Sequence, residues 1–106
     1  MLVVSRLSLP DRSVESVQAL ASPALQALSA RPGFLSGRLA RATDDPAQWV
    51  LVLEYDSVGA YRRALSAYDV KVHTTPLLAL AVDEVSAYEV LLDAAAGTSK
   101  SDRADG

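Results

Sequence analysis

The stretch Trp49–Tyr55 constrains the fold more than any other part of the sequence. Alternate residues of a strand point to opposite faces of its sheet, so the valines of this stretch lie on one face and its leucines on the other. An apolar run of this kind is typical of a strand that is covered on both sides. The rest of the chain supplies only enough helix to cover one side. We therefore expect a second copy of the same sheet to cover the other.

The composition is that of a single globular domain that does not bind polyanions. The chain has 106 residues, of which 50% are hydrophobic and 22% are charged. A net charge of −3 without a basic cluster argues against nucleic acid and against an anionic membrane surface as partners. We expect residues 1–96 to form the domain and residues 97–106, which are almost entirely polar or glycine, to form a disordered tail.

The residue types exclude several kinds of functional site. The sequence has no cysteine, which excludes disulfides, thiolate metal sites and a cysteine nucleophile. It has one histidine, which argues against a dedicated metal site, and it has no Gly-rich phosphate loop or nucleophile elbow. The apolar residues 1–4 are too few for a signal peptide or a membrane span, so we expect a cytoplasmic protein.

Turn and capping residues divide the chain into successive elements. Proline, glycine and aspartate interrupt the apolar patterns after residues 9, 30 and 42, and Ser13 and Ser57 are typical helix N-caps. Pro23, preceded by Ser22 as a new cap, predicts two consecutive helical pieces with a kink between them. The expected elements are a strand over 2–9, the kinked helix over 13–30, strands over 34–42 and 48–55, a helix from Ser57 with Tyr61, Ala64, Leu65 and Tyr68 buried, an ambiguous segment over 69–74, a short helix from Thr75 to about Ala81 and a strand over 85–92.

This β-α-β-β-α-β order predicts an α+β fold with a ferredoxin-like, four-stranded antiparallel sheet. Right-handed crossovers place the helices on the same face of the sheet and leave the other face open. Within the sheet, Gly37 indicates either a bulge or a point of close contact. RNA-recognition domains share this order, but they need aromatic and basic residues on the open face, where this acidic chain has Val and Leu.

Three segments together resemble the antibiotic biosynthesis monooxygenase family. They are the helix stop Arg31–Phe34, the strand-to-helix passage Trp49–Tyr61 and the closing Ser86–Val90. The resemblance covers most of residues 1–92. It implies a homodimer in which two ferredoxin-like sheets close into one dimeric α+β barrel, in agreement with the partner sheet expected from Trp49–Tyr55.

The resemblance also implies a choice of chemistry. Some members of the family oxidise polyketide hydroquinones or anthrones without a cofactor, whereas others degrade haem or act on signalling molecules. The haem degraders use an asparagine on the first strand, a tryptophan on the second helix and a histidine near the end of that helix. Here Ser5 and Ala64 stand at about the first two positions, and only His73 matches. We therefore expect no cofactor and disfavour haem.

His73 is the candidate catalytic residue. It is the only side chain whose ordinary pKa lies near neutrality, so it is the natural proton shuttle or axial ligand. The alternative is a histidine at a helix end that contacts free carbonyls or water.

The candidate substrate-binding residues are aromatic or polar. An indole or phenol ring can stack on a flat aromatic ligand, and the phenol can also hold or deprotonate a substrate hydroxyl. Packing in the core or in a dimer interface explains the same aromatic residues without a ligand. Arginines within apolar strands, at Arg6 and Arg38, indicate either an anionic substrate or ion pairs with Glu54 or Glu89. The substrate-binding candidates are Trp49, Tyr55, Tyr61, Tyr68, Ser5 and Arg38.

Two functions remain open from the sequence. The first is a cofactor-independent monooxygenase acting on a small aromatic or polyketide-like substrate, in which the protein supplies a dry pocket, a base and orientation. The second is a non-catalytic dimer that binds a small apolar ligand, haem or another protein.

Overall fold

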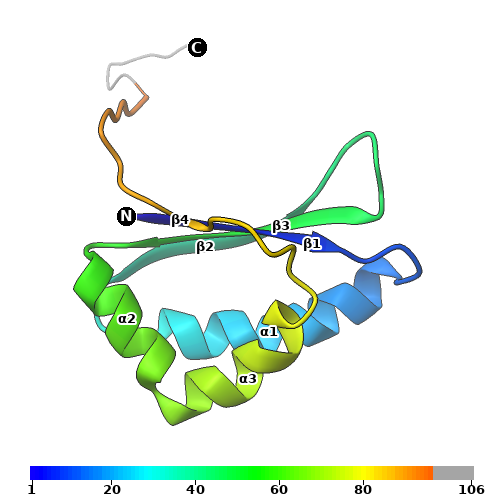
Figure 1. Cartoon of the computed structure of the whole chain (residues 1–106), viewed down its shortest axis with the longest axis horizontal. Helices are drawn as coiled ribbons and strands as arrows, with labels where there is room; N and C mark the ends of the chain where they lie inside the picture. The colour runs from blue at the N-terminus through cyan, green and yellow to red at the C-terminus, as the bar shows by residue number, and fades with distance from the viewer. Residues whose placement is uncertain (97–106) are drawn as a thin grey trace.

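Four strands and three helices form two layers in a computed structural model, which describes residues 1–96 (Figure 1). The sheet has the order β2-β3-β1-β4, and each neighbouring pair is antiparallel. All three helices lie on one side of the sheet, as Figure 1 shows. This confirms the ferredoxin-like α+β fold; the tail expected at 97–106 lies outside the described residues. The elements are β1 (Leu2–Ser8), α1 (Val14–Ser29), β2 (Phe34–Arg41), β3 (Gln48–Tyr55), α2 (Val58–Ser66), α3 (Tyr68–Leu78) and β4 (Ala87–Tyr88).

The central strand β3 shows the alternation that its sequence predicts. Its burial changes at every residue, so that Trp49, Leu51, Leu53 and Tyr55 are buried under the helices. On the opposite face the residues between them, Val50 among them, are only half-buried. Pairing with β1 continues this pattern, because Val4 lies opposite Val52 on the open face. The helices therefore cover one face of the sheet, and the other face is uncovered in a single chain.

Helix α1 begins as expected but is not interrupted. The Ser13 side chain accepts a hydrogen bond from the backbone N–H of Ser16 at 3.1 Å. The helix then runs without a break through Pro23, so the two pieces expected there are one helix. Proline removes the hydrogen bond to the carbonyl four residues earlier, at Ala19. Ala19 is exposed, so water can replace that bond at little cost.

The segment after β3 is more helical than its sequence indicated. Ser57 caps α2 by accepting from the N–H of Ala60 at 3.0 Å, as predicted. An extended residue, Ala67, then separates α2 from α3, which includes the ambiguous segment and begins well before Thr75. The prediction of a separate short helix that begins at Thr75 is therefore wrong. Tyr68, expected in the buried stripe, is 83% exposed because it is the first residue of α3 and belongs to a different helix from that stripe.

The last strand is much shorter than expected. We predicted strand structure over 85–92, but β4 contains only Ala87 and Tyr88. Its antiparallel register with β1 places Tyr88 opposite Leu2, close to the first residue of the chain. Beyond that point no β1 residues remain to pair with, and the chain leaves the sheet on the side away from the helices (Figure 1).

Two glycines allow close approaches in the region of α1 and β2. Gly33 has a φ of 88°, and a Cβ there would lie 2.6 Å from Ala60 Cβ, so the turn after α1 requires glycine. A Cβ on Gly37 would lie 3.0 Å from Leu25 Cδ2 and 3.1 Å from Leu53 Cδ2. Of the two roles predicted for Gly37, the structure therefore shows the close contact. The bulge lies elsewhere on the strand, between Phe34 and Ser36.

None of the helices within residues 1–96 combines the length and the apolar composition that crossing a membrane requires.

Candidate functional site

A groove of about 470 Å³ lies between α1 and the β2–β3 side of the sheet. This volume is in the range of sites for small organic ligands. The wall on the sheet is aromatic and aliphatic, and the wall on the helix is mainly small and polar. The lining residues are Gln18, Ala21, Ser22, Leu25, Gln26 and Ser29 from α1, Phe34, Gly37 and Leu39 from β2, and Trp49 from β3.

Trp49 lines this groove and contains a buried, unpaired hydrogen-bond donor. The residue is 7% exposed, and its indole Nε1 is buried without a hydrogen-bond partner among residues 1–96. Leaving a buried donor unpaired costs about 1–3 kcal/mol, so tryptophan N–H groups inside proteins usually have an acceptor. The indole therefore supplies a flat apolar surface to the groove, while its N–H is buried inside the protein.

Arg41 covers the same indole. The two residues are directly paired across β2 and β3, and the guanidinium carbon lies 5.6 Å from the centroid of the Trp49 ring. This geometry is a cation–π contact. Among residues 1–96 the only ion pair is between Arg6 and Glu84, so Arg41 has no ion-pair partner there, and it does not line the groove.

The helix wall of the groove is polar but uncharged. Gln18, Ser22, Gln26 and Ser29 are spaced by four, four and three residues, which places them along one flank of α1. Their amides and hydroxyls can donate to or accept from a ligand. None of the ten lining residues is charged or titrates near neutral pH, so the groove itself contains no general base.

A second, much smaller space lies under α2 and α3. Its volume is about 10 Å³, which is no larger than a water molecule needs. Ser5, Tyr61 and Thr74 are among its lining residues, together with leucine and valine side chains. The Thr74 hydroxyl donates to the Val70 carbonyl at 2.7 Å, so it already has a partner. This part of the core has no room for a substrate in the structure described here.

The three tyrosine candidates lie in different environments. Tyr55 is fully buried, its hydroxyl donates to the Leu28 carbonyl at 2.8 Å, and burial raises its pKa to about 12. Its ring packs against Phe34 and Tyr61, each at 5.5 Å between centroids. Burial also raises the pKa of Tyr61. Tyr68 is largely exposed. Tyr55 and Tyr61 are thus poor bases at neutral pH, and neither lines the groove.

The remaining predicted residues are not gathered around Trp49. His73 is exposed on α3 and is absent from the linings of both helix–sheet spaces. Ser5 is buried on β1 and lines the small space. Arg38 pairs in register with Val52, which places it on the open face of the sheet, opposite the helices. The structure therefore brings only Trp49, of the predicted residues, to the groove.

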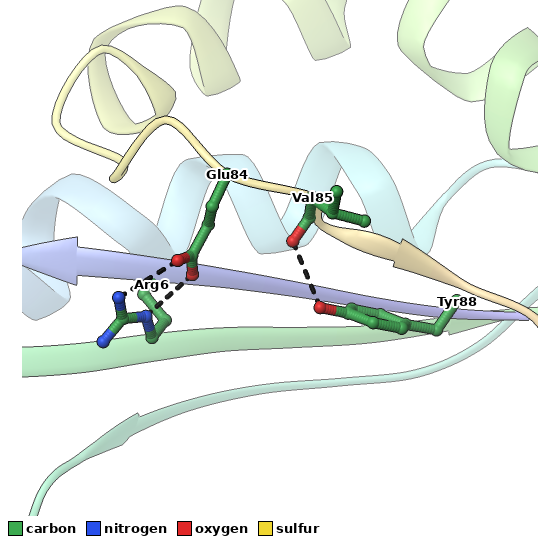
Figure 2. Close-up of polar contacts among 4 residues, drawn as sticks. All are labelled: Arg6, Glu84, Val85 and Tyr88. Atoms are coloured by element: carbon green, nitrogen blue, oxygen red, sulfur yellow. Dashed lines mark hydrogen bonds and ion pairs between the residues drawn. The ribbon is translucent and has the colours of Figure 1, made fainter.

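The ion-pair partner of Arg6 differs from the prediction. Its guanidinium donates to both carboxylate oxygens of Glu84, at 2.7 and 3.0 Å, rather than pairing with Glu54 or Glu89 (Figure 2). Glu84 lies opposite β1 because the chain returns along that strand after α3. Sequence spacing did not identify this pair, since the two residues are 78 positions apart.

Sequence reasoning missed the helix wall and Arg41. A signal for the helix wall was present, because Gln18, Ser22, Gln26 and Ser29 form an uncharged polar line beside the apolar stripe of α1. A solvent-facing flank more often carries charges. Arg41 has no comparable signal, since its contact with Trp49 depends on the register of β2 with β3. Among residues 1–96, no group of three or more histidine and acidic side chains is placed to hold a metal ion.

Several solved structures share this fold. The structure of SnoaB from Streptomyces nogalater, a cofactor-independent oxygenase, is 23% identical, aligns over 87% of this chain and 96% of its own, and has a TM-score of 0.68. A proposed antibiotic biosynthesis monooxygenase from Nitrosomonas europaea is 14% identical, with coverage of 86% and 98% and a TM-score of 0.67. A conserved protein from Methanosarcina mazei Go1 is 15% identical, with coverage of 81% and 84% and a TM-score of 0.65.

At these identities the structural matches show the fold alone. No curated protein matches the sequence. The family model for antibiotic biosynthesis monooxygenase, in contrast, matches residues 1–73, which is more than half of the chain and includes β1 through most of α3. On this match the chain belongs to the antibiotic biosynthesis monooxygenase family.

Proposed function

We propose that the protein is a cofactor-independent monooxygenase whose small aromatic or polyketide-like substrate binds in the groove between α1 and β2. The observation that carries this proposal is the groove itself, which has the volume of a ligand site and an aromatic wall that includes Trp49. Membership of the family supports an oxygenase, and the likeness to SnoaB, a cofactor-independent oxygenase, supports a reaction without a cofactor.

The proposed reaction uses the substrate as its own source of electrons. An anthrone-type methylene loses a proton to give an electron-rich anion, which reacts with dioxygen. One oxygen atom becomes the new carbonyl oxygen and the other leaves as water, so the methylene carbon loses four electrons and dioxygen gains four. The protein binds the flat substrate, orients it and stabilises the anion with hydrogen-bond donors.

No residue of the groove wall acts as the base that removes the substrate proton. None of the lining residues titrates near neutral pH, and Tyr55 is unsuited because its pKa is about 12 and its hydroxyl is already bound to a carbonyl. The proposal therefore requires a substrate that is acidic enough to ionise once its anion is stabilised. Water at the open side of the groove accepts the proton.

Oxygen consumption with an anthrone substrate tests this proposal. Ser22→Phe places a ring in the groove from the helix wall, and we expect oxygen uptake to fall by about tenfold or more because the substrate loses its space. Ala19→Phe is the matched control, since Ala19 is exposed on the same helix and does not line the groove. Equal uptake by the two variants would contradict a substrate site in the groove.

His73→Ala tests whether the reaction depends on the groove or on His73, the base that the sequence predicts. His73 lies outside the groove lining, so the groove mechanism expects the substitution to leave uptake within about twofold of the wild type. Loss of oxygen uptake in His73→Ala, together with normal uptake in Ser22→Phe, would place the reaction near α3. It would contradict the proposal that the groove is the substrate site.

The absence of a titratable group from the groove wall favours a second candidate function. In this alternative the groove binds a small apolar ligand and performs no chemistry. Tight binding of an anthrone without oxygen uptake above the uncatalysed rate would support this alternative and exclude the oxygenase.

We also propose that two copies of the chain associate through the open faces of their sheets. This face carries half-buried aliphatic side chains at Leu2, Val4, Val50 and Val52, which the helices do not cover. Apolar area on an open sheet gains stability when a second sheet packs on it. The second copy then supplies the cover that β3 requires, because both faces of this strand are apolar.

A further inference from the structure

We infer that two copies of the chain pack with their sheets crossed, so that Glu54 of each copy pairs with Arg38 of the other and Tyr88 of each copy fills a hollow in the other. This arrangement rests on the association through open sheet faces proposed above, and it specifies which residues of that face meet. An interface between two copies related by a two-fold axis must be complementary to itself, and the open face has this property.

Two charged side chains of the open face have no ion-pair partner in a single chain. Arg38 and Glu54 lie on this face because they pair in register with Val52 and Leu2, respectively. Arg6, the third charged residue that the register places there, is already bound in the only ion pair among residues 1–96. Glu54 is half-buried even in the single chain, so a sheet packed on this face must bring an opposite charge to it. The unpaired opposite charge on the same face is Arg38.

The open face also has an aromatic side chain at one end and a hollow at the other. Tyr88 is 49% exposed and lies in the same row across the strands as Glu54. The hollow, of about 280 Å³, lies towards the far end of the strands, around the row formed by Ala40, Val50 and Arg6. Its lining combines aliphatic side chains with guanidinium and amide groups, so it suits both the ring and the hydroxyl of a tyrosine.

The positions of the two charges determine the orientation of the axis. Arg38 and Glu54 are one strand and two residues apart in the register, or about 4.8 Å across the sheet and about 6.8 Å along it. A two-fold axis between the sheets that exchanges these positions lies about 55° from the strands, so the strands of the two sheets cross at about 70°. This crossing is close to the orthogonal class of sheet packing.

The same axis carries the hollow of one copy onto Tyr88 of the other. On these spacings the Ala40–Val50 row of the second copy falls over β4 of the first, where Tyr88 lies. Val4 and Val52 of the two copies then face one another near the centre of the interface. Apolar burial thus stabilises the pair of sheets, while the two ion pairs fix their orientation. The agreement between Tyr88 and the hollow supports the axis independently of the charges.

Mixing two charge-reversed variants tests the ion pairs. In Glu54→Arg and in Arg38→Glu, like charges meet at both pairs of a homodimer, so we expect the dissociation constant of each variant to rise about 100-fold or more. In a mixture of the two, each variant supplies the charge that the other needs. Native mass spectrometry should therefore show the heterodimer as the main dimer. Mixing would not restore an ion pair formed within one chain.

Arg62→Glu and Glu15→Arg are the matched controls, because they change charge in the same way at exposed positions of the helix layer. Each should dimerise as the wild type does, and their mixture should contain only the statistical share of heterodimer. Dimers of Glu54→Arg or Arg38→Glu as stable as the wild type, or no enrichment of their heterodimer, would overturn the crossed arrangement. Thermal unfolding confirms that the comparison is made between folded proteins.

A disulfide between copies tests the position of Tyr88. The chain has no cysteine, so a double variant with Ala40→Cys and Tyr88→Cys contains only the two introduced thiols. These positions lie on opposite edge strands, with β3 and β1 between them, too far apart for a disulfide within one chain. We expect oxidation to give a covalent dimer of the double variant and of neither single variant. A covalent dimer of a single variant, or none of the double variant, would contradict the arrangement.

Light scattering on the wild type distinguishes failure of this arrangement from failure of the proposed association. A wild-type monomer overturns both. A wild-type dimer that charge reversal at Glu54 and Arg38 leaves unchanged overturns the crossed arrangement, and the association through the open faces stands.

Discussion

Trp49 and Tyr55 lie near the two ends of β3, on the same helix-covered face. The Tyr55 hydroxyl reaches the Leu28 carbonyl at the end of α1, so this residue joins the helix layer to the sheet. The Trp49 indole lies beside the polar flank of the same helix and has no such partner among the described residues. The Trp49 ring lines the groove, which is consistent with ligand binding, whereas the satisfied hydroxyl of Tyr55 is consistent with a structural role.

Tyr55→Phe should lower stability near neutral pH. The change removes the hydroxyl donor and leaves the Leu28 carbonyl with the Arg31 N–H at 3.2 Å, so we expect unfolding in urea to show a loss of about 1 kcal/mol. Burial raises the pKa of Tyr55 to about 12 from an ordinary value near 10. The folded state therefore keeps a proton that the unfolded state loses, and wild-type stability should decline as pH rises from about 10 to 12.

The same decline should be smaller in Tyr55→Phe, because the ionisable group is gone. Tyr68→Phe is the control, since Tyr68 is exposed and should change neither quantity. Identical pH profiles for the wild type and Tyr55→Phe above pH 10 would contradict the buried, protonated Tyr55.

At the scale of elements, the sequence predicted the first half of the fold better than the second. The strand over 48–55 and the caps at Ser13 and Ser57 were predictable because apolar alternation and capping are local signals. The length of β4 was not, since it depends on where β1 begins, more than 80 positions away in the sequence. The groove was only partly predictable, because Trp49 stood out while its helix wall depends on how α1 packs on β2.

The return of the chain along β1 is held by few contacts. Val82 N–H donates to the Arg6 carbonyl at 2.8 Å, and Val4 N–H donates to the Ser86 carbonyl at 2.7 Å. Between these bonds, Glu84 binds Arg6 and the Tyr88 hydroxyl donates to the Val85 carbonyl at 3.2 Å (Figure 2). The segment from Val82 to Tyr88 is thus an irregular edge that depends on an exposed ion pair.

Glu84→Gln should loosen this edge without unfolding the domain. We expect faster hydrogen exchange at the Val82 and Val4 amides, and little change in the amides of β3. The hydrogen bond from Arg6 lowers the pKa of Glu84, so the ion pair should persist below the ordinary glutamate pKa and be lost as the pH falls through the lowered pKa. Glu89→Gln is the matched control, because Glu89 directly follows this segment. Unchanged exchange in Glu84→Gln would show that the ion pair does not hold the edge.

At the scale of the whole molecule, helices cover one face of the sheet and leave the other to a partner. The connection between β2 and β3 and the segment after β4 both extend on the uncovered side (Figure 1). Exposed apolar side chains at Val90, Leu91 and Leu92 continue along that segment. A single chain therefore exposes apolar surface on the side away from its own helices, where we propose that the second copy packs.

Light scattering should give the mass of a dimer for the wild type at micromolar concentration. Val52→Glu introduces a charge on the open face and should shift the protein to a monomer, because a carboxylate buried between two sheets lacks a partner. Val72→Glu is the matched control on α3, where the valine is 45% exposed on the helix layer. A monomeric wild type, or a dimer that survives Val52→Glu, would contradict the proposed interface.

The central claim is that the groove between α1 and β2 is the substrate site. A crystal structure of the protein with a hydroxyanthraquinone, an unreactive analogue of the oxidised product, tests it most directly. We predict the rings between the polar flank of α1 and the β2–β3 wall, in contact with the Trp49 ring. Rings bound instead under α2 and α3, around Ser5 and Tyr61, with an empty groove, would contradict the account.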